Sequence, residues 1–485
     1  MSTNISSLSP AVVWEQFDAI TRVPRPSKHE ELIIAWLIDF AKSHNLEYRR
    51  DKIGNVVILA PATAGFENRP IVILQSHVDM VCEKNSDVEF DFMHDAIRTR
   101  IDGEWVKAQG TTLGADCGIG MAAALAMLID PTVEHGPIEA LFTVDEETGL
   151  TGAFELEDGM LEGKHLINLD SEDEGELFIG CAGGVDTLAT FTYSKESMPS
   201  DCAIYRVDVS DLQGGHSGDD INKGLANSNK ILSRLLFEGA SRFGLRISYL
   251  DGGNLRNAIP REAYAVFGIC ASLSDSFEQM FKLFAEQIAE EFKVCEPNLK
   301  ITLSAVTGAE SVIDIATQKS LIGALVGLPN GVLAMSAAVT GLVETSTNLA
   351  SVKFEGDDKI VVTTSQRSSV ESAKRYAMLM IESVFVLAGA TVEHSDGYPG
   401  WAPNPDSELL RVAAASYKEL FGVEAKVKAI HAGLECGLFL ERYPELDMIS
   451  FGPTLRGVHS PDERLEIATV DKFWRLLCDI VKRIK

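Results

Sequence analysis

The chain has 485 residues, of which 46% are hydrophobic and 24% charged, a composition typical of a globular protein with two or more domains. Its 43 basic and 71 acidic residues give a formal net charge of −28, which argues against binding to nucleic acid or to an anionic membrane surface. The N-terminus lacks the basic and apolar regions of a secretory signal, and no apolar stretch approaches the ~18 residues of a membrane span. The eight cysteines contain no Cys-x-x-Cys pair, so we expect a cytoplasmic protein with reduced thiols.

The N-terminal part of the chain alternates between expected helices and expected strands. Helical periodicity covers residues 11–20 and 30–43, and apolar runs predict strands at 55–59, 72–75, 138–143 and 166–169. This alternation predicts an α/β sandwich with a mainly parallel sheet. We expect residues 1–186 to form the first segment of a catalytic domain of this class.

The middle of the chain has a different order of elements. Strand, helix, two strands, helix and strand are expected at 204–210, 220–238, 245–250, 262–271, 275–292 and 299–306, which is a β-α-β-β-α-β unit. A similar order then returns without its first strand, with helices at 316–327 and 369–389 and strands at 346–354, 359–366 and 390–394. Residues 187–398 are therefore predicted to form an inserted α+β lid domain of two ferredoxin-like-type units, and residues 399–485 to complete the catalytic domain.

The most informative segment is IVILQSHVDM at 71–80, a buried-strand pattern that ends in His77 and Asp79. Further residues of metal-ligand type follow other expected strands or precede a helix: Asp116, Glu146, Glu147, Asp170 and His459. Because the carboxyl ends of parallel strands meet at one edge of a sheet, we expect these side chains to converge. Two histidines with three or more carboxylates form the ligand set of a two-zinc hydrolytic site.

Each of these residues also has an ordinary interpretation. Asp116 could be a helix N-cap, Asp170 a loop residue and His459 a surface histidine. Glu146 and Glu147 could belong to a solvated acidic turn. Adjacent residues on a strand point in opposite directions, so both glutamates can serve one site only if the chain turns there, and the following Thr-Gly favours a turn.

The chain resembles the di-zinc exopeptidases of the aminoacylase and carboxypeptidase type and, within them, the bacterial aminoacyl-histidine dipeptidases. The resemblance runs almost the length of the chain. Its segments are SHVDM at 76–80, GTTLGADCGIGMA at 110–122, TVDEETG at 143–149, LINLDSEDEGE at 166–176, GCAGG at 180–184, GGHSG at 214–218, LRNAIPREA at 255–263, HAGLECGLF at 431–439 and GPTLRGVHSPDE at 452–463. The family has Asp-Asn where this chain has Asp116-Cys117, at a peptide bond that is typically cis in relatives. The sequence leaves open whether Cys117 keeps that bond and whether its thiol matters near metals.

The resemblance implies a role for each candidate residue. His77 and Asp170 would hold one Zn²⁺, Glu147 and His459 the other, and Asp116 would bridge them, with Co²⁺ or Mn²⁺ as possible substitutes. Asp79 would orient His77, and Glu146 would be the general base. In the lid, the implied substrate-binding residues are His216 and Asn257 for the oxyanion and Arg367 for the substrate α-carboxylate. From the catalytic domain, Gly433 would contact the substrate through its backbone.

The activity implied by the resemblance is zinc-dependent hydrolysis of aminoacyl-histidine dipeptides, including β-alanyl-histidine, by a metal-bridging water that Glu146 activates. One alternative keeps the metals and changes the substrate to an N-acyl amino acid or another short peptide class. Another is a binding relative that has lost catalysis, although the presence of all five ligands and Glu146 argues against it. We expect a small dipeptide substrate, no nucleic-acid or membrane partner, and a homodimer, although a doubled insert could supply His216 and Arg367 within one chain.

Overall fold

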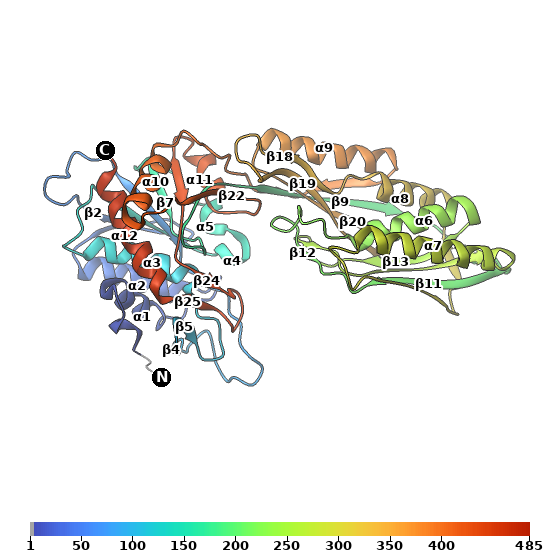
Figure 1. Cartoon of the computed structure of the whole chain (residues 1–485), viewed down its shortest axis with the longest axis horizontal. Coiled ribbons are helices and arrows are strands. Elements are labelled where there is room, and N and C mark those ends of the chain that lie inside the picture. Colours follow the sequence, from blue (N-terminus) through green and yellow to red (C-terminus); the bar gives the residue numbers. More distant parts are fainter. Residues whose placement is uncertain (1–3) are drawn as a thin grey trace. The chain divides into compact units, whose positions relative to one another are not determined.

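The computed structural model of the chain describes residues 4–485, which divide into two compact units (Figure 1). The first unit contains residues up to Gly180 together with Trp401–Ala429 and Leu434–Lys485. The second unit contains Cys181–Gly400 and Ile430–Gly433. Among the described residues, no helix is both long and apolar enough to cross a membrane.

The first unit is built on an eight-stranded sheet. Its order is β1 (Glu47–Arg50), β2 (Val56–Ala60), β6 (Ile138–Thr143), β3 (Val72–His77), β7 (His165–Asn168), β23 (Asp447–Ser450), β8 (Glu176–Cys181) and β22 (Lys426–Ile430). The four central strands β6, β3, β7 and β23 run parallel, whereas β1, β2 and β8 pair antiparallel with their neighbours. Every residue of β3 and β6 is buried, as expected for strands covered on both faces. The predicted mainly parallel sheet therefore forms the centre of this unit, with antiparallel strands beside it.

Helices cover this sheet. They are α1 (Ala11–Ile20), α2 (Glu31–Ser43), α3 (Ala115–Ile129), α10 (Glu408–Phe421) and α12 (Ile467–Arg483), with short α4 (Glu146–Gly149), α5 (Thr151–Phe154), α11 (Cys436–Arg442) and the 3-10 turn η1 (Ile5–Ser7). In α3 every residue from Cys117 to Leu128 is buried, which is typical of a helix packed on all sides. In α12 the buried side chains recur every three or four residues along one face.

Two features bring the C-terminal segment into the first unit. Strand β23 inserts between β7 and β8 in the main sheet. A second, four-stranded sheet joins β24 (Leu455–Arg456) and β25 (Arg464–Glu466) to β5 (Trp105–Ala108) and β4 (Thr99–Asp102). The loop that carries His459 lies between β24 and β25, so sheet pairing holds both of its ends.

The second unit contains a nine-stranded antiparallel sheet and four long helices. Along the sheet lie β16 (Lys300–Ala305), β11 (Cys202–Ser210), β15 (Ala263–Cys270), β13 (Arg246–Gly252), β19 (Val343–Glu355), β20 (Lys359–Ser368), β9 (Gly183–Thr192) and β21 (Thr391–His394), and β18 (Gly331–Met335) pairs with β19. The helices are α6 (Ser228–Phe243), α7 (Ser274–Phe292), α8 (Ile315–Gly327) and α9 (Glu371–Leu387). The smaller elements are η2 (Ala271–Leu273), the pair β10 (Lys195–Ser197) with β17 (Ser311–Ile313), and the pair β12 (Gly215–His216) with β14 (Ala258–Ile259).

The strand order shows how the two halves of this sheet are related. Strands β16, β11, β15 and β13 have the order 4-1-3-2 of one β-α-β-β-α-β unit, and β13 pairs with β19 of the second half. The second half takes its first strand, β9, from the chain that precedes the first half. The sequence predicted a second unit without a first strand; the structure supplies that strand from residues 183–192.

Helix α6 differs from the sequence prediction of a helix over 220–238. It begins at Ser228, because the Asn227 side chain accepts a hydrogen bond from the Lys230 N–H (3.2 Å) and caps the helix there. The preceding residues form turns instead of helix. The capping signal therefore outweighed the apolar periodicity that extended the prediction toward the N-terminus.

In the loop that follows β23, the backbone at Gly452 passes very close to the backbone of Ser171. A Cβ placed on Gly452 would lie 1.7 Å from the carbonyl oxygen of Ser171, in the loop that follows β7.

We therefore expect Gly452→Ala to destabilise the first unit by about 1–3 kcal/mol, the usual range for overpacking, as measured by urea unfolding. Gly323→Ala is the control, because Gly323 in α8 has no atom within 4 Å of its Cβ position and should be neutral or stabilising by about 0.4–1 kcal/mol. Equal stabilities for the two variants would contradict this account.

Candidate active site

The five candidate metal ligands lie where the parallel strands of the first unit end. His77 is the last residue of β3, Asp170 follows β7, and Glu147 lies in α4 directly after β6. Asp116 lies at the start of α3, and His459 lies in the loop between β24 and β25. Each side chain therefore reaches the same edge of the sheet from a different segment of the chain.

Asp116 faces both histidines. Its Oδ1 lies 3.2 Å from His77 Nε2, and its Oδ2 lies 3.3 Å from His459 Nε2. Asp170 Oδ1 lies 3.3 Å from the same nitrogen of His77, and Glu147 Oε2 lies 3.1 Å from that of His459. The five side chains thus form two groups, each of one imidazole and one carboxylate, with Asp116 shared between them.

The donor atoms fit two divalent cations. Ligand atoms of Asp116, Glu147 and His459 all lie within 4.8 Å of one another, and His77 forms similar groups with Asp170 and Cys117 and with the two glutamates of α4. The second oxygen of Glu147, Oε1, is buried without a hydrogen-bond partner. An ionised oxygen buried without a donor is costly unless a cation meets it, and imidazole with carboxylate is a ligand set that suits zinc.

The charges of this group shift the pKa values of its members. Burial lowers the pKa of His77, but the negative charge of Asp170 and the contacts of the imidazole with the carboxylates of Asp116, Asp170 and Asp79 outweigh burial and raise it well above its usual range. Hydrogen bonds with Asp116 and Glu147 raise the pKa of His459 to about 11. Burial raises the pKa of Asp170 to about 6. The site therefore attracts positive charge strongly, and a metal ion would have to displace protons from both imidazoles.

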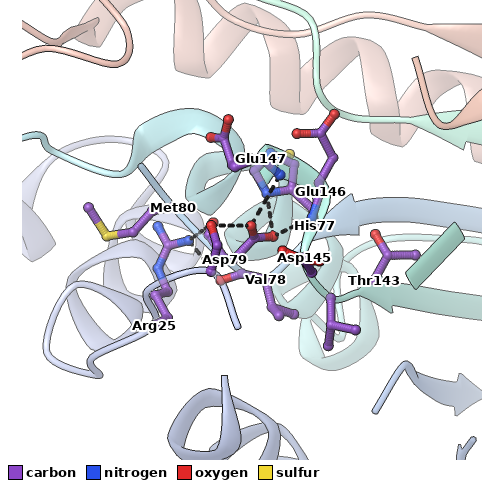
Figure 2. A network of polar contacts seen from close by, with 12 residues as sticks. Arg25, His77, Val78, Asp79, Met80, Thr143, Asp145, Glu146 and Glu147 are labelled. Atoms are coloured by element: carbon purple, nitrogen blue, oxygen red, sulfur yellow. Dashed lines mark hydrogen bonds and ion pairs between the residues drawn. The ribbon is translucent and has the colours of Figure 1, made fainter. Parts of the chain in front are cut away.

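Asp79 holds the turn that carries the two glutamates (Figure 2). The backbone N–H of Glu146 donates to Asp79 Oδ1 (3.0 Å), and that of Glu147 donates to Oδ2 (3.2 Å). Asp79 Oδ1 also lies 3.4 Å from His77 Nδ1, which is long for a hydrogen bond. Burial opposes ionisation of Asp79, but the contacts with His77 and these donors lower its pKa to about 2.

The chain turns at Glu146 and Glu147, as it must if both side chains are to face the same site. Asp145 has a positive φ of 52°, and Glu146–Gly149 form one helical turn, so the two side chains leave from the same end of β6. Burial raises the pKa of Glu146 well above its usual range, with the charges of Asp170, Glu435 and Glu147 adding to that effect. A carboxyl with a raised pKa is suited to both accepting and returning a proton.

Two buried charged residues that the sequence did not single out fix the loops of this site. The Arg25 guanidinium donates to the carbonyls of Val78 (2.8 Å) and Asp79 (2.6 Å), and also to that of Gly114 (Figure 2). The Glu463 carboxylate accepts the N–H groups of Leu113 (2.7 Å), Gly114 (3.0 Å) and Ala115 (2.7 Å). Each is only 2% exposed. Together they set the loop before Asp116 and join it to the segment that carries His459.

Glu435 is a third buried residue that the sequence left without a role. Its Oε2 accepts hydrogen bonds from Gln75 Nε2 (2.6 Å) on β3 and from Thr143 Oγ1 (2.9 Å) on β6. Burial raises the pKa of Glu435 to about 8. Gln75 lies two residues before His77 and Thr143 three residues before Glu146, so this carboxyl ties together the two strands that present those groups.

The Asp116–Cys117 peptide is cis in this chain, which answers a question that the sequence left open. The Cys117 side chain is buried, and its Sγ donates to the Leu169 carbonyl (3.4 Å). Burial raises the pKa of this thiol well above its usual value.

The expected substrate-binding residues lie in the second unit. Arg367 is 6% exposed, and its Nη1 donates to the Tyr398 hydroxyl (2.9 Å), while its Nε is buried without a partner. Among residues 4–485, no carboxylate forms an ion pair with Arg367. Beside it, His431 Nε2 lies 2.7 Å from Ser346 Oγ, and burial with the Arg367 charge lowers the pKa of His431 to about 4. A buried cation without an anion is costly, so an anionic ligand beside Arg367 would relieve this cost.

The other three expected residues belong to the same unit. His216 Nδ1 accepts from the backbone N–H groups of Gly218 (3.3 Å) and Asp219 (3.2 Å), which leaves Nε2 as the nitrogen available to a ligand. The side chain of Asn257 is exposed, and the backbone carbonyl of Asn257 accepts a hydrogen bond from the Ser217 N–H (2.8 Å). Gly433 was expected to act from the catalytic domain, but Ile430–Gly433 groups with the second unit.

Comparison with known proteins adds independent findings. The sequence profile of peptidase family M20/M25/M40 matches residues 73–483. The chain is 43% identical over 482 residues, 99% of both proteins, to an Escherichia coli K12 protein named cytosol non-specific dipeptidase. A crystal structure named aminoacylhistidine dipeptidase, from Vibrio alginolyticus, matches with a TM-score of 0.93 and 45% identity over 99% of this chain and 98% of that chain. A Staphylococcus aureus tripeptidase shares the fold at 15% identity, with a TM-score of 0.56 over 98% and 99% of the two chains.

The buried Glu435 generates a prediction about stability. Glu435→Ala leaves the buried amide of Gln75 and hydroxyl of Thr143 without their acceptor, so we expect a loss of at least about 2 kcal/mol in the free energy of unfolding. Glu435→Gln keeps an acceptor oxygen and should lose much less at acidic pH. Urea unfolding of the three proteins measures this, and an Ala variant as stable as the Gln variant would contradict it.

The difference in stability between the wild-type protein and the Glu435→Gln variant should depend on pH. The pKa of Glu435 is about 8 in the folded chain and near 4.5 when unshifted, so the unfolded chain ionises first as pH rises. The stability that the protonated carboxyl contributes is therefore present below about pH 4.5 and lost as pH approaches 8. The Gln variant has no such loss, and its stability relative to the wild type should rise across that range.

Proposed function

The chain belongs to the M20/M25/M40 family of peptidases, hydrolases that act on peptide bonds, and from this premise we propose that it is a two-zinc dipeptidase that cleaves aminoacyl-histidine dipeptides, including β-alanyl-histidine. The observation that carries the proposal is the shared position of Asp116 between His77 and His459. One carboxylate facing two imidazoles, each with a carboxylate of its own, is the arrangement that a bridged pair of cations needs.

His77 and Asp170 would hold one Zn²⁺, Glu147 and His459 the other, and Asp116 would contribute one oxygen to each. The chemistry that bound zinc would supply here is polarisation of the scissile carbonyl and a lowered pKa for the attacking water. Co²⁺ or Mn²⁺ could serve in place of zinc, because the geometry of a site rather than raw affinity decides which metal works.

Glu146 is the proposed general base. It takes a proton from the attacking water and returns it to the amine that leaves when the peptide bond breaks. Its raised pKa supports this role, since the carboxyl can hold the proton between the two transfers. Asp79 keeps Glu146 in place through the backbone N–H of that residue.

The residues of the second unit would hold the substrate. Arg367 is proposed to bind the α-carboxylate, because its buried guanidinium has no anionic partner among the described residues and its planar fork matches a carboxylate. His216 through Nε2 and Asn257 through its amide are proposed to donate to the oxyanion that forms at the scissile carbonyl. The backbone of Gly433 is proposed to contact the substrate as well.

The substrate class rests on the two most complete relatives described above. One is named for aminoacyl-histidine and the other as a non-specific dipeptidase, so the preference for histidine is the finer part of the proposal. The alternative substrates are other short peptides and N-acyl amino acids. Values of kcat/KM on β-alanyl-histidine, an unrelated dipeptide and an N-acetyl amino acid separate these cases.

A cytosolic location is proposed from the name of the E. coli relative, and a homodimer remains part of the proposal.

Neighbouring glutamates provide the sharpest test of the roles at the site. Glu146→Ala should keep both metals and the fold while kcat falls by about 10²–10⁴-fold, the usual contribution of a general base. Glu147→Ala should lose metal, because that carboxylate is a proposed ligand. Metal analysis beside turnover measures both effects. Metal loss in the Glu146 variant, or full turnover without metal, would overturn the assignment.

Arg367→Ala should lower kcat/KM on dipeptides by about 10–100-fold, since a hydrogen bond to a charged group contributes about 1.5–3 kcal/mol. Metal content should stay unchanged. Arg367→Lys should recover only part of the loss, because an ammonium cannot pair with both carboxylate oxygens in the same plane. Arg234→Ala is the control, since Arg234 is an exposed residue of the same unit that pairs with Glu291 and should have wild-type kinetics. Wild-type kcat/KM in the Arg367 variant would show that the residue is structural.

A further inference from the structure

Two cysteines of the second unit lie opposite each other on neighbouring strands. Cys202 is the first residue of β11 and Cys270 the last residue of β15, and the antiparallel register of the two strands pairs them directly. Both side chains are partly exposed and both thiols are free. Neither residue belongs to the proposed metal or substrate site.

The backbone hydrogen bonds show which kind of pair this is. The N–H of Ala271 donates to the carbonyl of Asp201 (2.8 Å), one residue beyond the pair on each strand, and the N–H of Cys202 donates to Pro199 rather than to Cys270. This is the pattern of a non-hydrogen-bonded pair, in which the Cα atoms are about 4.5 Å apart and the side chains are closest. That separation lies within the ~4.4–6.8 Å that a disulfide bond spans.

The two cysteines are surrounded by Gly268, Met198 and polar groups. Gly268 lies two residues before Cys270 and on the same face of β15, and a Cβ at this position would lie 2.4 Å from Met198 Sδ and 3.2 Å from the Cβ of Cys202. Glycine at this position therefore lets the Met198 side chain pack beside Cys202. The Cys270 Sγ lies near two polar groups, with Ser272 Oγ at 3.1 Å and Asp201 Oδ2 at 3.4 Å.

From this geometry we propose that Cys202 and Cys270 form a reversible dithiol–disulfide site, which oxidises by exchange with a low-molecular-weight disulfide of the glutathione type. The Cys270 thiolate attacks one sulfur of the small disulfide, and one small thiol leaves. Cys202 then attacks the Cys270 sulfur, the protein disulfide forms and the second small thiol leaves. Two protein thiols and one small disulfide thus give one protein disulfide and two small thiols, with two electrons transferred.

The bond would join two adjacent strands of the first half of the sheet, at the end from which the chain leaves toward η2 and α7. Exposed disulfides of this kind are the reducible ones, because small thiols reach them readily. The site does not rest on the proposed peptidase mechanism, and peptidase kinetics should be unchanged by either substitution below.

The test uses the whole protein in buffers of increasing glutathione disulfide to glutathione ratio. Intact mass should fall by two hydrogen atoms per chain, non-reducing peptide mapping should show one linkage between the peptides of Cys202 and Cys270, and dithiothreitol should reverse both changes. Cys202→Ser should instead accumulate a glutathione adduct on Cys270, since no second thiol can displace it. Cys295→Ser is the matched control. Cys295 is another partly exposed cysteine of this unit, and its Sγ donates a hydrogen bond to the Gly224 carbonyl. Replacing Cys295 should leave the linkage between Cys202 and Cys270 intact.

Either of two results would overturn the proposal. One is a wild-type protein that stays reduced, or carries only glutathione adducts, when the oxidised form of glutathione is in large excess. The other is a linkage in which a different cysteine replaces Cys202 or Cys270. Circular dichroism of the serine variants confirms that they are folded, so a missing linkage cannot be attributed to unfolding.

Discussion

The first unit is organised around the repulsion between carboxylates at one edge of its sheet. Asp116, Glu147, Asp170 and Glu146 gather there within reach of two imidazoles. Burial, with the charges of neighbouring carboxylates adding to it, raises the pKa values of Asp170 and Glu146. The fold holds them together because each lies at the end of a buried parallel strand or on a loop fixed by buried hydrogen bonds.

Three buried ionisable side chains supply that fixation from outside the ligand set. Arg25 binds the carbonyls that follow β3, Glu463 binds the N–H groups before Asp116, and Glu435 bridges β3 and β6. Each pairs mainly with backbone or neutral side chains, so it fixes position without neutralising the ligand carboxylates. The negative field at the edge of the sheet therefore remains available to a cation, and this is the property on which a two-metal hydrolytic site depends.

The sequence alone could predict the parts of this architecture that repeat or alternate. The apolar run before His77 predicted a buried strand, and the structure has all six residues of β3 buried. The turn at Glu146 followed from the need for both glutamates to face one site, and it is present. Strand β9 was missed although buried and less buried residues alternate along most of it. Its partners in the second half of the sheet lie more than 150 residues later in the chain, so no neighbouring strand in the sequence indicated the pairing.

The supporting residues of the site were beyond sequence reasoning for a different reason. Arg25, Glu435 and Glu463 are isolated charged residues whose partners are backbone groups or neutral side chains of distant segments, and neither periodicity nor ligand spacing marks them. Glu435 and Glu463 lie inside motifs that carried the family resemblance, which offered a signal but no role. The placement of Cys117 beside Asp170 and the cis peptide before it likewise leave no mark in the sequence pattern.

The central claim is that Asp116 shares its carboxylate between two bound metal ions. Crystals of the zinc-loaded protein, measured on both sides of the zinc absorption edge, test this most directly. The account predicts two anomalous peaks in the first unit, one beside His77 and Asp170 and one beside Glu147 and His459, each bound by one oxygen of Asp116. A single peak at full zinc loading, or two peaks that do not both contact Asp116, would contradict it.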